Sequence, residues 1–594
     1  MAAAGTPTPA SDDLPQWGRV LITGGTDWPI LGRKPAKGQV QAVNEKAPDL
    51  PGPHILRALC NVKMRRVITS HSSCHAVFLA VNGDAYIVGR NEQGQCGFPV
   101  KPAPGQIGGL AIYEPLKLDR KTMFSPTLPQ GDNGKIVAAA TGRSHTLLVT
   151  KNGQIYSSGS NAFGQCGHER LGNFEMFTKI ETAAYIKEKD PVIAVSCGLT
   201  FSLILTTSGK VYALGSSEKG QLGNGRTGEH FISGNKLAFN TFTEPLLIKG
   251  LADKKITQIA CGQQHSIAMD EDGLVYAWGF GGYGRLGIGS QQDQLLPALV
   301  PQFAKENTLT RARKIFAGPT NSAVIDGQKM FWLAGKWKNS GEGSAGQGYM
   351  TFKYLPDLMG CRIRNVGLGG VTLFCTAEED PSLRGSHDAT MNVAWGQNAQ
   401  NGELGLGPDK PKSATKPQRC ETLDGISILE IAAGQNTTYY VARNLGEAYS
   451  ELNRFPEHVD SSEMCVVCQA ETKPSRANPG EEDALLECEK CENPYHLSCL
   501  TPPLEAVPDG EWHCPQCVAE AADGEEEEEQ STNAKSGSGK KAAGGRGKAS
   551  GADGDINENG EEADEEESSA TNGGKRGRAK PKANSAGASK RRKT

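Results

Sequence analysis

The chain of 594 residues lacks several kinds of segment, and each absence excludes a class of protein. No apolar run approaches the roughly 18 residues that a membrane-spanning helix needs. The opening residues MAAAGTPTPASDDLPQ have neither the basic start nor the apolar centre of a signal peptide. A P-loop and a G-x-S-x-G nucleophile elbow are also missing, so no catalytic constellation is visible. We therefore expect a soluble intracellular protein, without a membrane span, that acts mainly by binding.

The apolar periodicity of a helical solenoid is missing too, and a strand repeat takes its place. Its unit is a strand, a G-x-x-H turn or a relative of it, a second strand, a turn, a third strand ending in Gly, and G-Q-x-G. The segments ATGRSHTLLVTKNGQIYSSGSNAFGQCG and ACGQQHSIAMDEDGLVYAWGFGGYGRLG are two copies. Seven residues hold equivalent positions: His75, His145, Phe201, His265, Asn321, Thr372 and Thr437. Seven such units predict an all-β fold, a seven-bladed β-propeller.

The two ends of the repeat region complement each other. The last unit stops after the strand at Thr438 to Ala442, and the chain begins with an orphan half-unit, Arg19 to Gly32. We expect the amino-terminal half-unit to complete the seventh blade, because closure removes an open sheet edge. The recurring His75, His145 and His265 are expected to bond main chain between blades and not to bind metal.

Eight residues of the kinds that bind zinc gather in the last quarter of the chain. They follow the spacing C-x2-C-x19-C-x2-C-x4-H-x2-C-x14-C-x2-C, starting at Cys465 and ending at Cys517. Paired Cys residues two apart suit tetrahedral metal sites, and the stretch has too few large apolar residues to fold unaided. The pattern predicts two structural Zn²⁺ ions. The alternatives are a reduced cytosolic chain that is merely rich in cysteine here and the disulfide framework of a secreted module.

The stretch LLECEKCENPYHLSCLTPPLEAVPDGEWHCPQC, Leu485 to Cys517, resembles the plant homeodomain (PHD) finger, because its His is fifth among the ligands and Trp512 precedes the seventh by two residues. The resemblance implies cross-braced ligation and a histone tail bound as an added strand along Ala484 to Glu487. One zinc would be held by Cys465, Cys468, His496 and Cys499, and the other by Cys488, Cys491, Cys514 and Cys517.

Acidic residues lie where such a finger would meet the tail. Met464 and Pro494 occupy positions where readers of trimethyl-lysine carry an aromatic cage, so the cage is missing. Carboxylates instead accept charge-assisted bonds from an unmodified lysine. The alternative is that these acids form only a solvated loop. The predicted tail-binding residues are Glu481, Glu482, Asp483, Leu485, Leu486, Glu487, Glu489, Pro508 and Gly510, the last two beside the amino terminus of the tail.

The repeats resemble the regulator of chromosome condensation family, in particular its telophase disc branch. The resemblance rests on LITGGTDWPILGRK (Leu21 to Lys34), WGFGGYGRLG (Trp278 to Gly287), CRIRNVGLGG (Cys361 to Gly370) and GELGLGPDKPKSAT (Gly402 to Thr415). The founding member of the family is a nucleotide exchange factor for a nuclear small GTPase and docks on nucleosomes. The resemblance therefore implies a small GTPase as a partner, and the insertion Asn224 to Thr243 is our first candidate for its contact.

The last part of the chain has no aromatic residues and alternates between acidic and basic runs. Such composition cannot bury enough apolar surface to become ordered. Its basic clusters predict nuclear import signals or weak DNA contacts. They comprise Lys575, Arg576, Arg578, Lys580, Lys582, Lys590, Arg591, Arg592 and Lys593. We expect a nuclear protein, on chromosomes or the spindle midzone in mitosis, with a cytoplasmic pool.

These features predict five regions and one main function. The regions are a disordered start (1–17), the propeller (18–445), a linker (446–462), the PHD-type finger (463–519) and a disordered acidic and basic tail (520–594). The function is that of a chromatin-associated adaptor, whose finger binds a histone tail with unmodified lysine and whose propeller binds a second protein such as a small GTPase. Two alternatives stay open: a guanine nucleotide exchange factor recruited to chromatin, and a scaffold for non-histone proteins.

Overall fold

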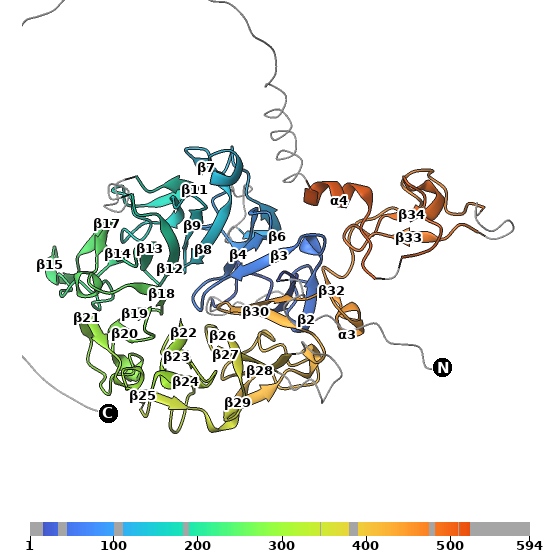
Figure 1. The fold of residues 1–594 in the computed structure, drawn as a ribbon. Helices are drawn as coiled ribbons and strands as arrows, with labels where there is room; N and C mark the ends of the chain where they lie inside the picture. Colours follow the sequence, from blue (N-terminus) through green and yellow to red (C-terminus); the bar gives the residue numbers. More distant parts are fainter. Residues whose placement is uncertain are drawn as a thin grey trace, which may run out of the picture. The chain divides into compact units, whose positions relative to one another are not determined.

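The computed structural model describes residues 16–33, 44–99, 111–181, 189–344, 346–378, 390–474, 482–508 and 510–522. In this part of the chain, seven sheets of four or five strands are arranged as blades around a ring (Figure 1). The predicted seven-bladed β-propeller is confirmed. No helix among the described residues has the length and apolar character to span a membrane.

The first six blades follow one another along the chain, each with four antiparallel strands, and in the second blade the short strand β7 (Phe124–Ser125) adds parallel to β11 (Asn173–Lys179). Blade one contains β3 (Met64–Ile68), β4 (His75–Ala80), β5 (Ala85–Arg90) and β6 (Ala111–Lys117), and blade two contains β8 (Ile136–Thr141), β9 (His145–Thr150), β10 (Ile155–Ser160) and β11, with β7 at the edge. Blade three contains β12 (Val192–Cys197), β13 (Phe201–Thr206), β14 (Val211–Ser216) and β17 (Thr241–Leu247), and blade four contains β18 (Ile256–Cys261), β19 (His265–Asp270), β20 (Val275–Gly279) and β21 (Gln294–Leu299). Blade five contains β22 (Ala312–Ala317), β23 (Asn321–Asp326), β24 (Phe331–Gly335) and β25 (Tyr349–Tyr354), and blade six contains β26 (Ile363–Leu368), β27 (Thr372–Glu378), β28 (Thr390–Gly396) and β29 (Ala414–Arg419).

The second strand of each blade shows why the sequence folds this way. Every residue of β9 is buried, although side chains alternate between the two faces of a strand. Leu147 packs into a cluster with Val195 of the following blade, whereas Leu148 packs with Val77 of the preceding one. A strand that is apolar on both faces is therefore stable only between two neighbouring blades, as the ring provides.

Blade seven is assembled from both ends of the repeat region. It contains β30 (Ile428–Ala433), β31 (Thr437–Ala442), β1 (Arg19–Gly24) and β2 (Leu50–Leu56). The strand β1 pairs antiparallel with β31 in the register Leu21↔Tyr440. The expected closure by the amino-terminal half-unit is thus confirmed.

The segment expected to be a linker is packed against blade seven. Its short helix α3 (Glu447–Ser450) places Tyr449 in the core of the blade, where the side chain is 2% exposed. The following strand β32 (Arg454–Phe455) pairs parallel to β2, which makes it the fifth strand of the sheet. The chain therefore leaves the propeller along the outer edge of the blade that closes the ring.

The repeated histidines join neighbouring blades, and hydroxyl groups take part besides the main chain. Each ring bonds a hydroxyl of the next blade, and this hydroxyl in turn reaches a main-chain oxygen. Ser202 Oγ, for example, lies 3.0 Å from the carbonyl oxygen of Gln165. The rings of His75 and His265 also bond the backbone of His145 and Asn321, respectively, in the next blade. The Nε2-to-hydroxyl distances are 2.8 Å for His75 to Thr146, 2.9 Å for His145 to Ser202 and 2.9 Å for His265 to Ser322.

Candidate zinc centres and peptide-binding edge

The finger begins with a turn that brings two sulfur atoms together. The N–H of Gln469 donates to the carbonyl of Cys465 at 2.8 Å, and Gln469 adopts a left-handed φ of 55°. The same turn recurs after Cys488, where the N–H of Glu492 donates at 2.9 Å and Glu492 has a φ of 53°. The C-x2-C spacing therefore produces one local structure twice, each time ready to hold one metal ion.

Short elements deliver the other ligands. The hairpin of β33 (Leu485–Glu487) and β34 (Pro494–His496) ends at His496, and the 3-10 turn η10 (Leu497–Cys499) carries Cys499. The helix α4 (Pro515–Ala522) follows Cys514 and contains Cys517. The eight ligands form two interleaved groups, as the resemblance implied: Cys465, Cys468, His496 and Cys499; and Cys488, Cys491, Cys514 and Cys517.

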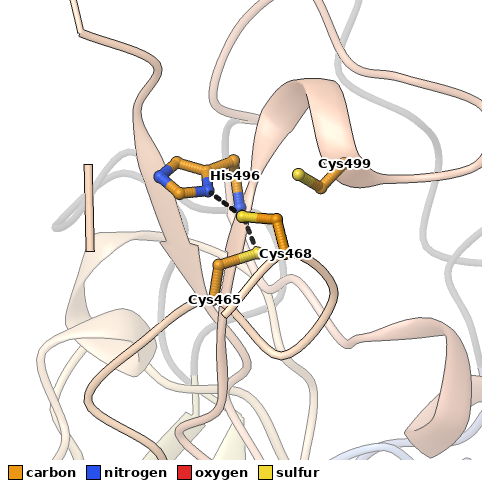
Figure 2. A group of neighbouring side chains, drawn as sticks. All are labelled: Cys465, Cys468, His496 and Cys499. Carbon is orange, nitrogen blue, oxygen red and sulfur yellow. Dashed lines mark hydrogen bonds between the residues drawn. The ribbon is translucent and has the colours of Figure 1, made fainter. Parts of the chain in front are cut away.

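The geometry of both groups fits zinc. Within each group all ligand atoms lie within 4.8 Å of one another, and Figure 2 shows the first four side chains converging. Bonds of about 2.3 Å to sulfur and about 2.0 Å to nitrogen place tetrahedral ligand atoms about 3.8 Å (S to S) or about 3.5 Å (S to N) apart. The Sγ atoms of Cys491 and Cys514 are 3.8 Å apart, and Cys468 Sγ is 3.3 Å from His496 Nδ1. Two structural Zn²⁺ ions therefore belong to this finger.

Nearby donors favour the thiolate form of the ligands. The N–H of His496 donates to Cys465 Sγ at 3.4 Å, and the N–H of Cys514 donates to Cys488 Sγ at 3.3 Å. Burial opposes ionisation of Cys465, but backbone N–H groups outweigh it and lower the pKa of this thiol to about 6. Because the thiolate is the form that binds metal, these donors prepare the site for a cation.

The strand β33 keeps one edge open. It pairs antiparallel with β34, in the register Leu485↔His496, and no strand of the described residues pairs with its other edge. Leu485 is 39% exposed, whereas Leu486 is 9% exposed and packs in the core of the finger with Tyr495. Ala484 to Glu487 can therefore accept an added strand, and the side chain of Leu486 packs in the core of the finger beneath it.

The acids predicted to bind the tail fall into three groups. Glu482 and Glu487 are exposed and pair with no cation among the described residues. Asp483 is buried and accepts a bond from the N–H of Ser498 at 3.1 Å, so it supports η10 instead. Glu489 is paired with Arg454 of β32.

Two further residues predicted to meet the tail lie after η10. Pro508 is partly exposed, and Gly510 is exposed with a φ of 91°. Glu481 lies outside the described residues, as do all the basic residues from Lys575 to Lys593 that were predicted to bind DNA or direct import. Their roles stay predictions.

Comparison with known proteins assigns both folded parts of the chain to families. The family model of the RCC1-like domain matches residues 19–440. The chain belongs to the RCC1-like family. In this RCC1-like chain, residues 465–517 match the PHD-finger family, with all eight ligands inside the match. The expected family and the expected type of finger are confirmed.

Relatives of this RCC1-like protein are known from sequence and structure. Human protein RCC2 is 31% identical over 457 residues, which cover 74% of this chain and 79% of the relative. The structure of Kap60 bound to yeast RCC1 (Prp20) has a TM-score of 0.55 at 18% identity, covering 75% of this chain and 96% of the other. Prp20p of Saccharomyces cerevisiae, described with its binding properties to Gsp1p and histones, has a TM-score of 0.54 at 17% identity and covers 74% of this chain and 96% of its own.

Proposed function

We propose that this RCC1-like protein is a chromatin-associated adaptor whose finger binds a histone tail with unmodified lysine. The observation that carries the proposal is the edge of β33, which no described strand pairs with, beside two exposed carboxylates that pair with no cation among the described residues, Glu482 and Glu487. A peptide added at this edge gains main-chain hydrogen bonds along its length. Its lysine ammonium would meet a carboxylate, and trimethylation would remove every N–H that can donate to it.

The aromatic residues of the finger support a preference for unmodified lysine. Residues 463–519 contain only two, Tyr495 and Trp512. Their rings contact each other at 5.7 Å between centroids, and Tyr495 is 6% exposed. Met464, at a position where a cage residue would stand, is 43% exposed and offers a thioether instead of a ring face. Recognition of a quaternary ammonium depends on ring faces, so trimethyl-lysine has no suitable partner here.

A second partner would bind the propeller, and one insertion is the best candidate for its contact. Residues 224–243 contain the hairpin of β15 (His230–Ile232) and β16 (Lys236–Ala238). Phe231, Ile232 and Leu237 on this hairpin are 74%, 49% and 47% exposed. Exposed apolar side chains that gather on one hairpin mark a protein-binding surface. The binding properties of Prp20p to Gsp1p and histones support a second protein partner and a place of action on chromatin. A small GTPase as this partner rests on the resemblance to the regulator of chromosome condensation family.

Calorimetry with the unmodified histone-tail peptide tests the role of the two carboxylates. We expect Glu482→Gln and Glu487→Gln each to weaken binding about fivefold to thirtyfold, which corresponds to the loss of one charge-assisted bond of roughly 1–2 kcal/mol. Glu505→Gln, also an exposed acid of the finger, is the matched control and should leave the affinity unchanged. Equal affinities for all four proteins would contradict recognition by these acids.

A further inference from the structure

Blade seven presents three arginines to the finger, and each meets a glutamate. The arginines come from three different elements: β1, the 3-10 turn η2 (Arg57–Leu59) and β32. All three glutamates belong to the finger. The pairs are Arg19 with Glu511 at 3.3 Å, Arg57 with Glu492 at 2.9 Å, and Arg454 with Glu489.

Two of these arginines are deeply buried. Arg19 is 7% exposed and Arg57 is 5% exposed. Arg57 also donates to the carbonyl oxygen of Pro456 at 2.8 Å and to that of Glu489 at 3.2 Å. A buried guanidinium that loses its partners is costly, so separating the finger from Arg19 and Arg57 would cost more than separating exposed surface pairs.

Neutral groups continue the same interface. Asn61 Nδ2 donates to the carbonyl oxygen of Cys517 at 2.7 Å, and Asn444 Nδ2 donates to Glu511 at 3.0 Å. Cys60 Sγ lies 3.5 Å from Nε2 of His513. The finger thus contacts blade seven with main-chain and side-chain groups as well as charges.

Most of the contacting residues of the finger lie next to a ligand of the second zinc centre. Glu489 follows Cys488, Glu492 follows Cys491, and His513 precedes Cys514. The second zinc therefore shapes the surface that faces the propeller. The edge of β33, where Leu485 and Glu487 are exposed, stays accessible while this surface is in use.

We propose that blade seven holds the finger in cis through these three pairs, and that Arg454 occupies the carboxylate of Glu489. The second part rests on the proposed function, because it assigns recognition of the tail to Glu482 and Glu487 and excludes Glu489. Arg454 is then a specificity-determining residue: it supplies within the chain the cation that Glu489 would otherwise take from a ligand.

A double-mutant cycle in the full, zinc-loaded chain tests the exclusion of Glu489. The probe is the unmodified histone-tail peptide, measured by calorimetry. Glu489→Gln should leave its affinity unchanged, Arg454→Ala should raise it severalfold, and the double variant should return to the affinity of the unchanged chain. Arg362→Ala, which removes an arginine paired with Glu378 on another blade, is the control. A loss of affinity in Glu489→Gln alone, as large as in Glu487→Gln, would overturn the assignment.

Hydrogen exchange on the same full chain tests the docking without any peptide. Removal of zinc with a chelator should increase amide exchange in η2 and β32, because the surface that contacts them is lost. The 3-10 turn η4 (Lys249–Leu251), which follows the last strand of blade three as η2 follows β2, should be unaffected. Unchanged exchange in η2 and β32 would overturn the docking. If no variant binds the peptide, the proposed function fails. Amide exchange in η2 and β32 then still shows whether the finger docks on blade seven.

Discussion

At the scale of the residue, His496 contributes to the first zinc centre in two ways. Its Nδ1 faces Cys468 Sγ, while the backbone N–H of the same residue donates to Cys465 Sγ. One side chain thus supplies a ligand, and its backbone supports a second ligand. Neutral imidazole with a fixed ring orientation is the form that zinc requires.

Substitution of His496 should remove one zinc ion and unfold the finger. Structural zinc supplies roughly 10–16 kcal/mol of folding free energy in small modules, which the core around Leu486 and Tyr495 cannot replace. We expect His496→Ala to bind at most one zinc ion per chain, compared with two in the unchanged protein, as measured by native mass spectrometry. Cys361→Ser, a partly buried cysteine of the propeller, should retain both ions. Two ions in His496→Ala would contradict the assigned ligands.

His145 makes the stability of the propeller depend on pH. Burial lowers its pKa to about 3, and an unfolded chain has a histidine pKa of about 6.5. Between these values the unfolded state binds a proton that the folded state does not, so stability falls as the pH falls below 6.5. At pH 5.5 the loss from this one histidine is about 1.4 kcal/mol.

The chain itself suggests the variant for this test, because Asn321 occupies the equivalent position in blade five. His145→Asn should lose less stability than the unchanged protein between pH 7.5 and pH 5.5, by about 1.4 kcal/mol in the free energy of unfolding. Urea unfolding followed by tryptophan fluorescence at the two pH values measures this difference. Parallel losses in both proteins would show that His145 does not titrate on unfolding.

At the scale of the element, substitutions in the hairpin β15–β16 should change binding of the second partner without changing the stability of the propeller. Its apolar side chains lie outside the blade cores, so their removal should not change the unfolding temperature. We expect Phe231→Ser with Leu237→Ser to weaken binding of a small GTPase at least tenfold, because large exposed apolar residues dominate interface energies. Capture from a panel of purified small GTPases, with and without nucleotide, is the measurement.

The matched control is Leu296→Ser on β21, where the side chain is 54% exposed on another blade. It should leave capture unchanged. Equal capture by the hairpin variant and by the unchanged protein would move the contact to a different surface. Accelerated nucleotide release by the unchanged protein would favour the exchange-factor alternative over a passive adaptor.

Elements also show what the sequence could and could not predict. Glycine turns and alternating strands were enough for seven blades, and ligand spacing was enough for two zinc ions, because these are local patterns. The division of the eight ligands into two interleaved groups came instead from the resemblance to the PHD finger. The buried side chain of Leu486 was also predictable, since Leu485 and Glu487 on either side must face the opposite way in a strand. The pairing of Arg57 with Glu492 was not, because it joins segments hundreds of residues apart and no spacing encodes it.

At the scale of the whole molecule, blade seven combines two tasks. It closes the ring with β1 and carries the exit strand β32, and its arginines contact the finger. An adaptor built this way would present the open edge of β33 in a fixed relation to the propeller surface. Binding of a histone tail and of a second protein would then occur on one folded body, which favours simultaneous engagement over independent binding by tethered modules.

Calorimetry on the full, zinc-loaded chain tests the central claim most directly, with an unmodified histone-tail peptide and its trimethyl-lysine counterpart titrated under identical conditions. The account predicts one peptide bound per chain and an affinity at least tenfold higher for the unmodified tail, because exposed carboxylates are available and no aromatic cage is. Tighter binding of the trimethylated peptide, or binding of neither, would contradict it.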